Sequence, residues 1–157
     1  MIEEKFPKSI LTKGIISGKE YGWKLDDIPE VIEEARKLNL GIVGGQIQYI
    51  FTDGTCELYW INDDPKEKNI NETWTDYVNR SCNEFINIFK SKILKTDIHK
   101  EAIESFEILK DKVKNGINID EYKYRKPTKN EIIWINFSKI RKARCTLSLR
   151  YRSVRLA

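Results

Sequence analysis

The segment of residues 42–61, IVGGQIQYIFTDGTCELYWI, decides how this chain folds. Two runs of apolar and aromatic residues flank Asp53-Gly54, and an Asp-Gly pair in this setting predicts a β-hairpin with a two-residue type I′ turn. This turn places Thr52 opposite Thr55 and sets the register of the two strands. The predicted pairs further from the turn are Phe51–Cys56, Ile50–Glu57, Tyr49–Leu58, Gln48–Tyr59, Ile47–Trp60 and Gln46–Ile61.

The predicted hairpin has one apolar face and one mixed face, because successive side chains of a strand point to opposite sides. The apolar face carries Ile47, Tyr49, Phe51, Cys56, Leu58 and Trp60. The mixed face carries Gln46, Gln48, Ile50, Glu57, Tyr59 and Ile61. We expect the apolar face to be buried, so that Trp60→Ala costs about 3–5 kcal/mol. The mixed face is either an ordinary solvated surface or a recognition surface, since aromatic residues are favoured at interfaces.

Helical periodicity predicts three amphipathic helices outside the hairpin. The first follows Asp27, which has Glu30 three residues later in capping-box spacing. The second opens at Thr73, with Asp76 in the same spacing. A third begins a few residues after the second and ends at Gly116, a typical C-terminal stop. Because so few residues join the last two helices, we expect them to pack antiparallel.

Two further segments read as strands. Residues 9–25 predict a loose hairpin, and residues 131–138 (EIIWINFS) predict a central strand because they are apolar on both faces. Gly44-Gly45, inside a strand pattern, indicates a bulge or the close approach of another backbone. The expected fold class is α+β: an antiparallel sheet of four to six strands with three amphipathic helices packed on one side.

The charge is distributed unevenly along the chain. Of 28 basic residues, six lie in residues 141–157, which contain no acidic residue, so residues 1–140 hold 22 basic and 24 acidic residues. We predict a single globular domain over residues 1–140 and an Arg-rich tail over residues 141–157 that is an edge strand or disordered. The sequence shows no secretory signal and no apolar run long enough to cross a bilayer. We therefore expect a cytoplasmic protein without membrane contact.

Patterns typical of catalysis or metal binding are weak in this chain. Cys56, Cys82 and Cys145 lie far apart and His99 is the only histidine, so a Cys/His zinc site would lack ligands. We expect reduced, packed thiols and a solvated His99 on a helix, and hence no catalytic residue, metal or cofactor. One alternative stays open: a small enzyme or a nucleic-acid-binding protein acting through the basic tail, where arginines would neutralise phosphates and Tyr151 would stack on a base.

The central block carries CELYWINDD and then ETWTDYVNRS, in which Trp74, Tyr77 and Arg80 lie three residues apart. Over about residues 20–115, this block resembles small bacterial immunity proteins that are encoded beside polymorphic toxins. The resemblance implies a cytosolic single-domain inhibitor that binds a toxin domain and needs no cofactor. It transfers no site residue, and the oligomeric state stays open.

Partner binding is expected on the mixed face of the hairpin and in the loop that follows it. Side chains that hydrogen-bond or stack on this face are Gln46, Gln48, Glu57 and Tyr59. The loop adds the acidic groups Asp63, Asp64 and Glu67. These carboxylates would steer a basic toxin domain toward the surface. A protein partner is thus expected, and a nucleic acid is not.

Overall fold

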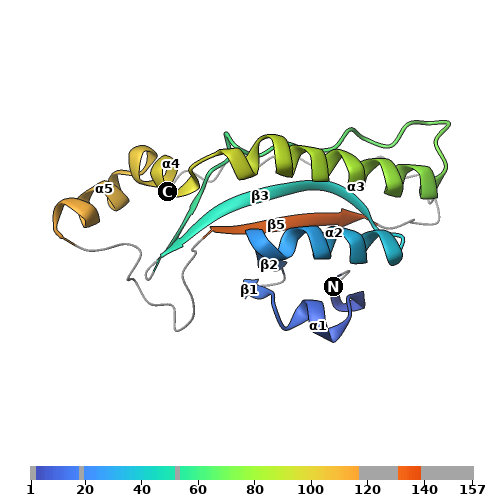
Figure 1. Ribbon diagram of the computed structural model, residues 1–157, viewed down its shortest axis with the longest axis horizontal. Helices are drawn as coiled ribbons and strands as arrows, with labels where there is room; N and C mark the ends of the chain where they lie inside the picture. Colours follow the sequence, from blue (N-terminus) through green and yellow to red (C-terminus); the bar gives the residue numbers. More distant parts are fainter. Residues whose placement is uncertain (1–2, 18–19, 52–53, 117–130, 139–157) are drawn as a thin grey trace, which may run out of the picture.

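An antiparallel sheet forms the centre of the computed structural model, which describes residues 3–17, 20–51, 54–116 and 131–138 (Figure 1). Five strands lie in the order β1-β2-β5-β3-β4 within these residues. Their bounds are β1 Ile15–Ser17, β2 Glu20–Lys24, β3 Gly41–Phe51, β4 Gly54–Glu57 and β5 Glu131–Ser138. The predicted α+β class is confirmed. So is the central position of β5, which pairs with β2 on one side and β3 on the other.

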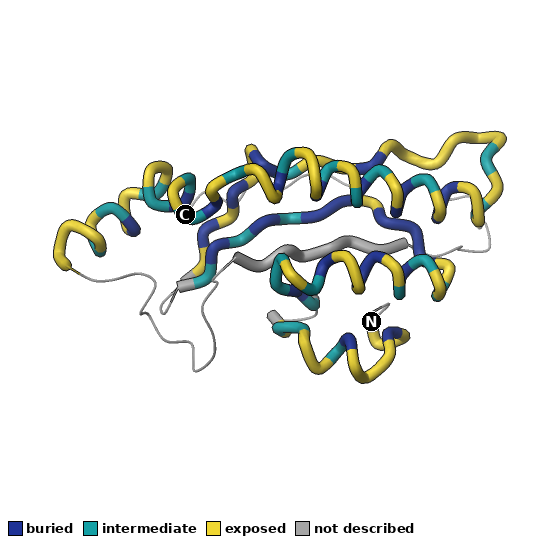
Figure 2. Tube along the Cα trace, in the orientation of Figure 1, coloured by how far each residue is buried: buried dark blue, intermediate teal, exposed yellow. Residues whose placement is uncertain are grey.

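The helices that the structure describes are α1 Lys8–Leu11, α2 Ile28–Lys37, α3 Trp74–Ser91, α4 Ile98–Ser105 and α5 Glu107–Lys114, with 3-10 turns η1 Glu3–Lys5, η2 Leu25–Asp27 and η3 Ile93–Lys95. Of these five helices, α2, α3 and α4 contact strand β3, whereas α5 packs on α4. In Figure 2, β3 is buried along most of its length, whereas α2 and α3 alternate between buried and exposed positions. This alternation is expected of helices that cover a core with one side.

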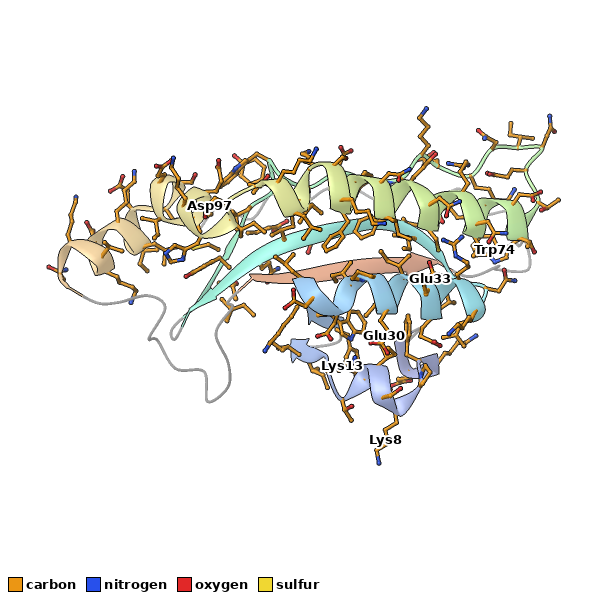
Figure 3. All side chains as sticks on the ribbon, viewed as in Figure 1. Lys8, Lys13, Glu30, Glu33, Trp74 and Asp97 are labelled. Carbon is orange, nitrogen blue, oxygen red and sulfur yellow. The ribbon has the colours of Figure 1, made fainter. Side chains whose placement is uncertain are left out.

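The core lies between one face of the sheet and the helices α2 and α3. Its large side chains include Trp23, Val31, Ile32, Ile47, Tyr49, Val78, Phe85 and Phe89. Near the N-terminus, Lys13 pairs with Asp27 and Glu30 beside α2 (Figure 3). The other sheet face presents Gln46, Gln48 and Glu57, which are partly or fully exposed. The alternation predicted for β3 therefore separates core from surface as expected.

Side-chain caps begin α3 and α4, at Thr73 and Asp97, whereas α1, α2 and α5 have none. Thr73 caps α3, since its hydroxyl accepts a hydrogen bond from the amide of Asp76 at 3.2 Å, as predicted. Asp27 precedes α2 but makes no side-chain capping bond, so the predicted capping box is wrong there. The 3-10 turn η2 already leads into α2, and the Asp27 carboxylate lies 3.6 Å from Lys13 instead.

The predicted third helix is two helices. Phe106 has extended backbone angles (φ −112°, ψ 116°) and separates α4 from α5, while Gly116 ends α5 with a positive φ of 73° as predicted. Figure 1 shows α4 and α5 beyond the end of α3, not folded back along it. The expected antiparallel packing is therefore wrong. The chain changes direction between α3 and α4, at the 3-10 turn η3 and the extended Thr96 (φ −89°, ψ 130°), so α4 continues away from α3.

The hairpin register differs from the prediction by two residues. Tyr49 pairs with Cys56 and Gln48 with Glu57, so Leu58 and Tyr59 are not the partners of these β3 residues. A shift of two keeps each strand residue on its predicted face, because the side-chain period of a strand is two. The predicted turn at Asp53-Gly54 is wrong, because Gly54 already belongs to β4 and pairs with Phe51. Residues 52–53 and 141–157 lie outside the described residues.

Strand β4 ends at Glu57, and the alternation of side chains ends with it. Residues 58–61 form a turn, closed by a 3.0 Å hydrogen bond from the amide of Ile61 to the carbonyl of Leu58. Leu58 is fully buried, as predicted, but Trp60 is 37% exposed, so the predicted burial of Trp60 is wrong. Ile61, predicted on the mixed face, is buried.

The bulge expected at the Gly-Gly pair agrees with the structure, and the close approach at Gly44 is made by a side chain, not by a backbone. The β3–β5 register shifts between Ile42 and Gly44, which marks a bulge or irregularity. The loop after the hairpin also approaches closely, since a Cβ on Gly44 would lie 2.9 Å from Cγ of Asp64. Absence of a side chain at Gly44 therefore lets the loop lie against the strand.

Candidate partner-binding surface

Residues 58–61, called here the aromatic turn, expose two aromatic side chains. Tyr59 is 71% exposed and meets Trp60 edge to face, with 5.1 Å between ring centroids. The Trp60 indole packs against Phe106 and donates a 3.1 Å hydrogen bond from Nε1 to the carboxylate of Glu101 on α4. Leu58, the first residue of the turn, is buried in the core and fixes the turn to it. The arrangement holds Trp60 in place and leaves Tyr59 open to solvent.

Carboxylates surround the aromatic turn. Glu57 immediately precedes it, Asp63 lies just after it, and Glu101 contacts its indole. Glu57 accepts a 3.4 Å hydrogen bond from Nδ2 of Asn62, and Asp63 lies 3.6 Å from the ammonium of Lys92. The ion pair partly neutralises Asp63, while Glu57 is exposed and forms no ion pair with any cation among the described residues. The local balance is acidic, which favours a basic partner.

The predicted site residues fall into separate groups. Gln46 and Gln48 lie on the sheet face opposite the helices, and Gln48 is the direct cross-strand neighbour of Glu57. Tyr59 does not lie on that face, because it belongs to the aromatic turn. The backbone of Gln46 pairs with Trp134 of β5. The structure thus brings Gln48 and Glu57 together and sets Tyr59 beyond the end of their strand.

The acidic loop residues differ in their surroundings. Asp63 pairs with Lys92 at the end of α3, and the carboxylate of Asp64 lies over Gly44. Glu67 is exposed, and its backbone carbonyl accepts a 2.9 Å hydrogen bond from Arg80. All three belong to residues 62–73, called here the connecting segment, which joins the aromatic turn to α3.

Arg80 holds the connecting segment against α3. Its guanidinium binds Glu72 through two bonds, from Nε to Oε1 at 2.7 Å and from Nη2 to Oε2 at 2.8 Å, and lies 3.1 Å from Glu84. It also donates to the carbonyls of Lys66 and Glu67, at 3.2 and 2.9 Å. Hydrogen bonds from Arg80 lower the pKa of Glu72 to about 2. We call these contacts the Arg80 network.

The three-residue spacing of Trp74, Tyr77 and Arg80 places them in a row along α3. The rings of Trp74 and Tyr77 lie 5.3 Å apart, and the guanidinium of Arg80 lies 5.4 Å from the Tyr77 ring centroid. Trp74 Nε1 donates to the carbonyl of Asn39 at 2.9 Å. The sequence reveals the three-residue spacing but not the contacts of Arg80 with the connecting segment. Neither Glu72 nor Lys66 lies in a motif that would indicate Arg80 as its partner.

His99 is not the solvated helix residue that the sequence predicts. It is partly buried, and its Nδ1 lies 2.9 Å from the hydroxyl of the buried Tyr49. This contact joins α4 to β3. Cys56 and Cys82 are buried, and desolvation raises the pKa of each thiol to about 11, so these thiols stay protonated at neutral pH. This agrees with the expected packed thiols; Cys145 lies outside the described residues.

Searches of the described residues find no group of three or more His, Cys, Asp or Glu that could hold a metal ion. None of the helices that the structure describes is long and apolar enough to cross a membrane. Comparison of the chain with protein-family models, with curated protein sequences and with solved structures finds no match.

Proposed function

We propose that this chain is a protein-binding module, and specifically an immunity-type inhibitor that binds and neutralises a basic toxin domain in the cytoplasm. The observation that carries the proposal is the aromatic turn: Tyr59 is exposed, Trp60 is held by Glu101 and Phe106, and carboxylates surround them. Tyr and Trp are the side chains most enriched among the residues that dominate binding energy. The resemblance of the central block to immunity proteins points to the same class of partner.

The residues of the surface divide into anchor and rim. Tyr59 is the anchor, because a rigid, amphipathic ring loses little conformational freedom on binding. Asp63 and Glu57 are rim charges, which act on the association rate and on its salt dependence. Gln46 and Gln48 lie on the sheet face opposite the helices and are not part of this rim. No cofactor enters this mode of action.

A paired growth and binding experiment tests the proposal. The probe is the C-terminal toxin domain of the reading frame next to this gene, expressed with and without this chain. We expect the chain to restore growth and to bind the purified domain. Tyr59→Ala should weaken binding by about 2 kcal/mol, a rise in Kd of roughly 30-fold, through faster dissociation. A matched control is Ile16→Ala, an exposed residue of β1, the strand at the opposite edge of the sheet from β4.

The rim is tested separately from the anchor. Asp63→Asn should slow association and flatten its salt dependence while leaving dissociation nearly unchanged. Failure of the wild-type chain to bind the toxin domain, or to restore growth, would refute the proposed function. Equal dissociation rates for Tyr59→Ala and Ile16→Ala would show that the binding surface lies elsewhere.

A further inference from the structure

We propose that the connecting segment is a second recognition element, whose apex residue Ile70 inserts into an apolar pocket on the same partner. The inference rests on the proposed function and adds the location and chemistry of a second anchor. It begins from one observation: Ile70 is 98% exposed, the highest exposure among the large apolar side chains in the described residues.

Ile70 occupies the apex of a fixed turn. The amide of Glu72 donates to the carbonyl of Asn69 at 3.2 Å, and the amide of Asn69 donates to Oε2 of Glu72 at 3.1 Å. Central positions of such turns ordinarily carry Gly, Pro, Asn, Asp or Ser. An isoleucine there contributes nothing to the fold, because its side chain is left in water. It gains free energy only when another surface buries it.

The apex is held rigid by the Arg80 network. Glu72 closes the turn, and each of its two carboxylate oxygens accepts one hydrogen bond from Arg80. Lys66 is fixed as well, since its amide donates to Glu84 at 2.8 Å and its carbonyl accepts from Arg80. A segment fixed before binding loses less conformational entropy on association, so its contacts contribute more to affinity. The network therefore presents Ile70 in a preorganised conformation.

The connecting segment runs along α3 in the opposite direction to the helix. Lys92, at the end of α3, contacts Asn62 and Asp63, whereas Arg80 contacts Lys66 and Glu67 further back along the helix. Figure 3 marks the two ends, with Trp74 opening α3 and Asp97 just beyond its other end. The aromatic turn and Ile70 thus lie near opposite ends of α3.

One partner is large enough to cover both ends. The helix α3 has 18 residues, which corresponds to a length of about 27 Å. A standard interface buries about 800 Å² on each partner, a patch roughly 30 Å across. Tyr59 and Ile70 are therefore separated by about the width of one ordinary interface.

Charge around the apex defines the pocket that would receive Ile70. Lys66 and Lys68 are exposed beside the apex, with Glu67 between them. Glu72 closes the turn and Glu84 contacts Arg80 nearby, so charges of both signs surround the apex. The complementary partner carries a basic patch opposite Tyr59 and, near the other end of α3, an apolar pocket whose rim carries charges of both signs.

The test uses the purified toxin domain named above as probe. We expect Ile70→Asp to raise Kd at least tenfold and Ile70→Ala to raise it several-fold. Their urea unfolding curves should match that of the wild type, because the side chain is exposed. Ile16→Ala is the control for removing an exposed isoleucine. In the complex, amide hydrogen exchange at residues 69–72 should slow.

A second variant tests the preorganisation. Arg80→Lys keeps the positive charge and loses the two-pronged contact with Glu72. In the free protein it should speed amide exchange at residues 69–72, and it should slow association with the toxin domain. Unchanged exchange in Arg80→Lys would show that Arg80 does not hold the apex.

The outcomes separate the two proposals. Binding by the wild type that Ile70→Asp leaves unaltered overturns this inference and leaves the proposed function in place. Loss of affinity in Tyr59→Ala but not in Ile70→Asp likewise confines the partner to the aromatic turn. Absence of binding by the wild type overturns both.

Discussion

Leu58 and Trp60 are two residues apart and would share a face in a regular strand. In this protein Leu58 is fully buried while Trp60 is 37% exposed, because the strand ends at Glu57. The sequence contains a sign of this ending: Asn62-Asp63-Asp64-Pro65, a loop pattern, follows directly. The exposed indole is the central feature of the candidate surface, and it follows from where one strand stops.

The burial difference predicts an order of stability. Leu58→Ala should lower the free energy of unfolding by about 2–5 kcal/mol, since it leaves a cavity in the core. Trp60→Ala should lower it by about 1 kcal/mol, the typical cost of a substitution outside the core. Urea unfolding followed by circular dichroism measures both. A larger loss for Trp60→Ala would mean that the indole belongs to the core.

Gly44 and Asp64 predict a strong dependence of one substitution on the other. The three atoms nearest to a Cβ on Gly44 all belong to the Asp64 carboxylate group, the third at 3.4 Å. Gly44→Ala alone should therefore displace the Asp64 side chain. In an Asp64→Ala background, the same change meets no close atom and should stabilise the protein by about 0.4–1 kcal/mol, through reduced unfolded-state entropy. A double-mutant cycle checks this, and additive effects would exclude the contact.

At the scale of elements, the connecting segment depends on α3 for its conformation. It has no regular secondary structure between the aromatic turn and Trp74, and loops of such length in compact domains are usually functional or disordered. Here the Arg80 network fixes it by side-chain contacts to Glu72 and Glu84 and to two backbone carbonyls. Its geometry is therefore decided by a residue on the neighbouring helix.

The Arg80 network predicts a pH dependence of stability. The pKa of Glu72 is lowered from 4.5 to about 2. The Glu72 carboxylate therefore binds a proton less tightly in the folded protein than in the unfolded chain. The stabilisation is complete above about pH 4.5 and is lost as the pH falls toward 2. Glu72→Gln should remove this part of the pH dependence, whereas Glu104→Gln, at an exposed position on α4, should not. Urea unfolding from pH 2 to 6 measures the difference, and identical profiles for wild type and Glu72→Gln would disprove it.

At the scale of the whole molecule, the sheet is completed by a distant segment. β5 follows the helices in the chain, yet it lies between β2 and β3 and pairs with both. Without β5 the two hairpins, β1-β2 and β3-β4, would have no strand between them. The arrangement makes the fold dependent on pairing across a long stretch of chain, which is slow to form.

The position of β5 predicts which truncations fold. A chain ending at Ile140 retains every described strand and should give the same circular dichroism spectrum and the same urea midpoint as the full chain. A chain ending at Gly116 lacks β5 and should not unfold cooperatively. Size-exclusion chromatography distinguishes monomer from aggregate in both. Aggregation of the Ile140 chain would show that the Arg-rich tail is needed for folding.

The sequence by itself determined the local elements of this protein. The Thr73 cap, the amphipathic helices, the faces of β3, the irregularity at Gly44 and the central character of β5 all follow from residues close together in the chain, because caps and side-chain periods act over a few residues. For the candidate surface, it suggested Tyr59 and the acidic loop residues, but it did not show that they lie in separate surroundings.

Only the tertiary structure decided the rest. The end of β4, the break at Phe106 where its ring meets Trp60, the hold of Arg80 on the connecting segment and the insertion of β5 between the hairpins all join residues distant in the chain. Such contacts depend on which surfaces meet, and packing overrides local preference where they do. The exposed Trp60 is the clearest case, because its environment is set by the end of one strand and by a ring 46 positions later, at Phe106.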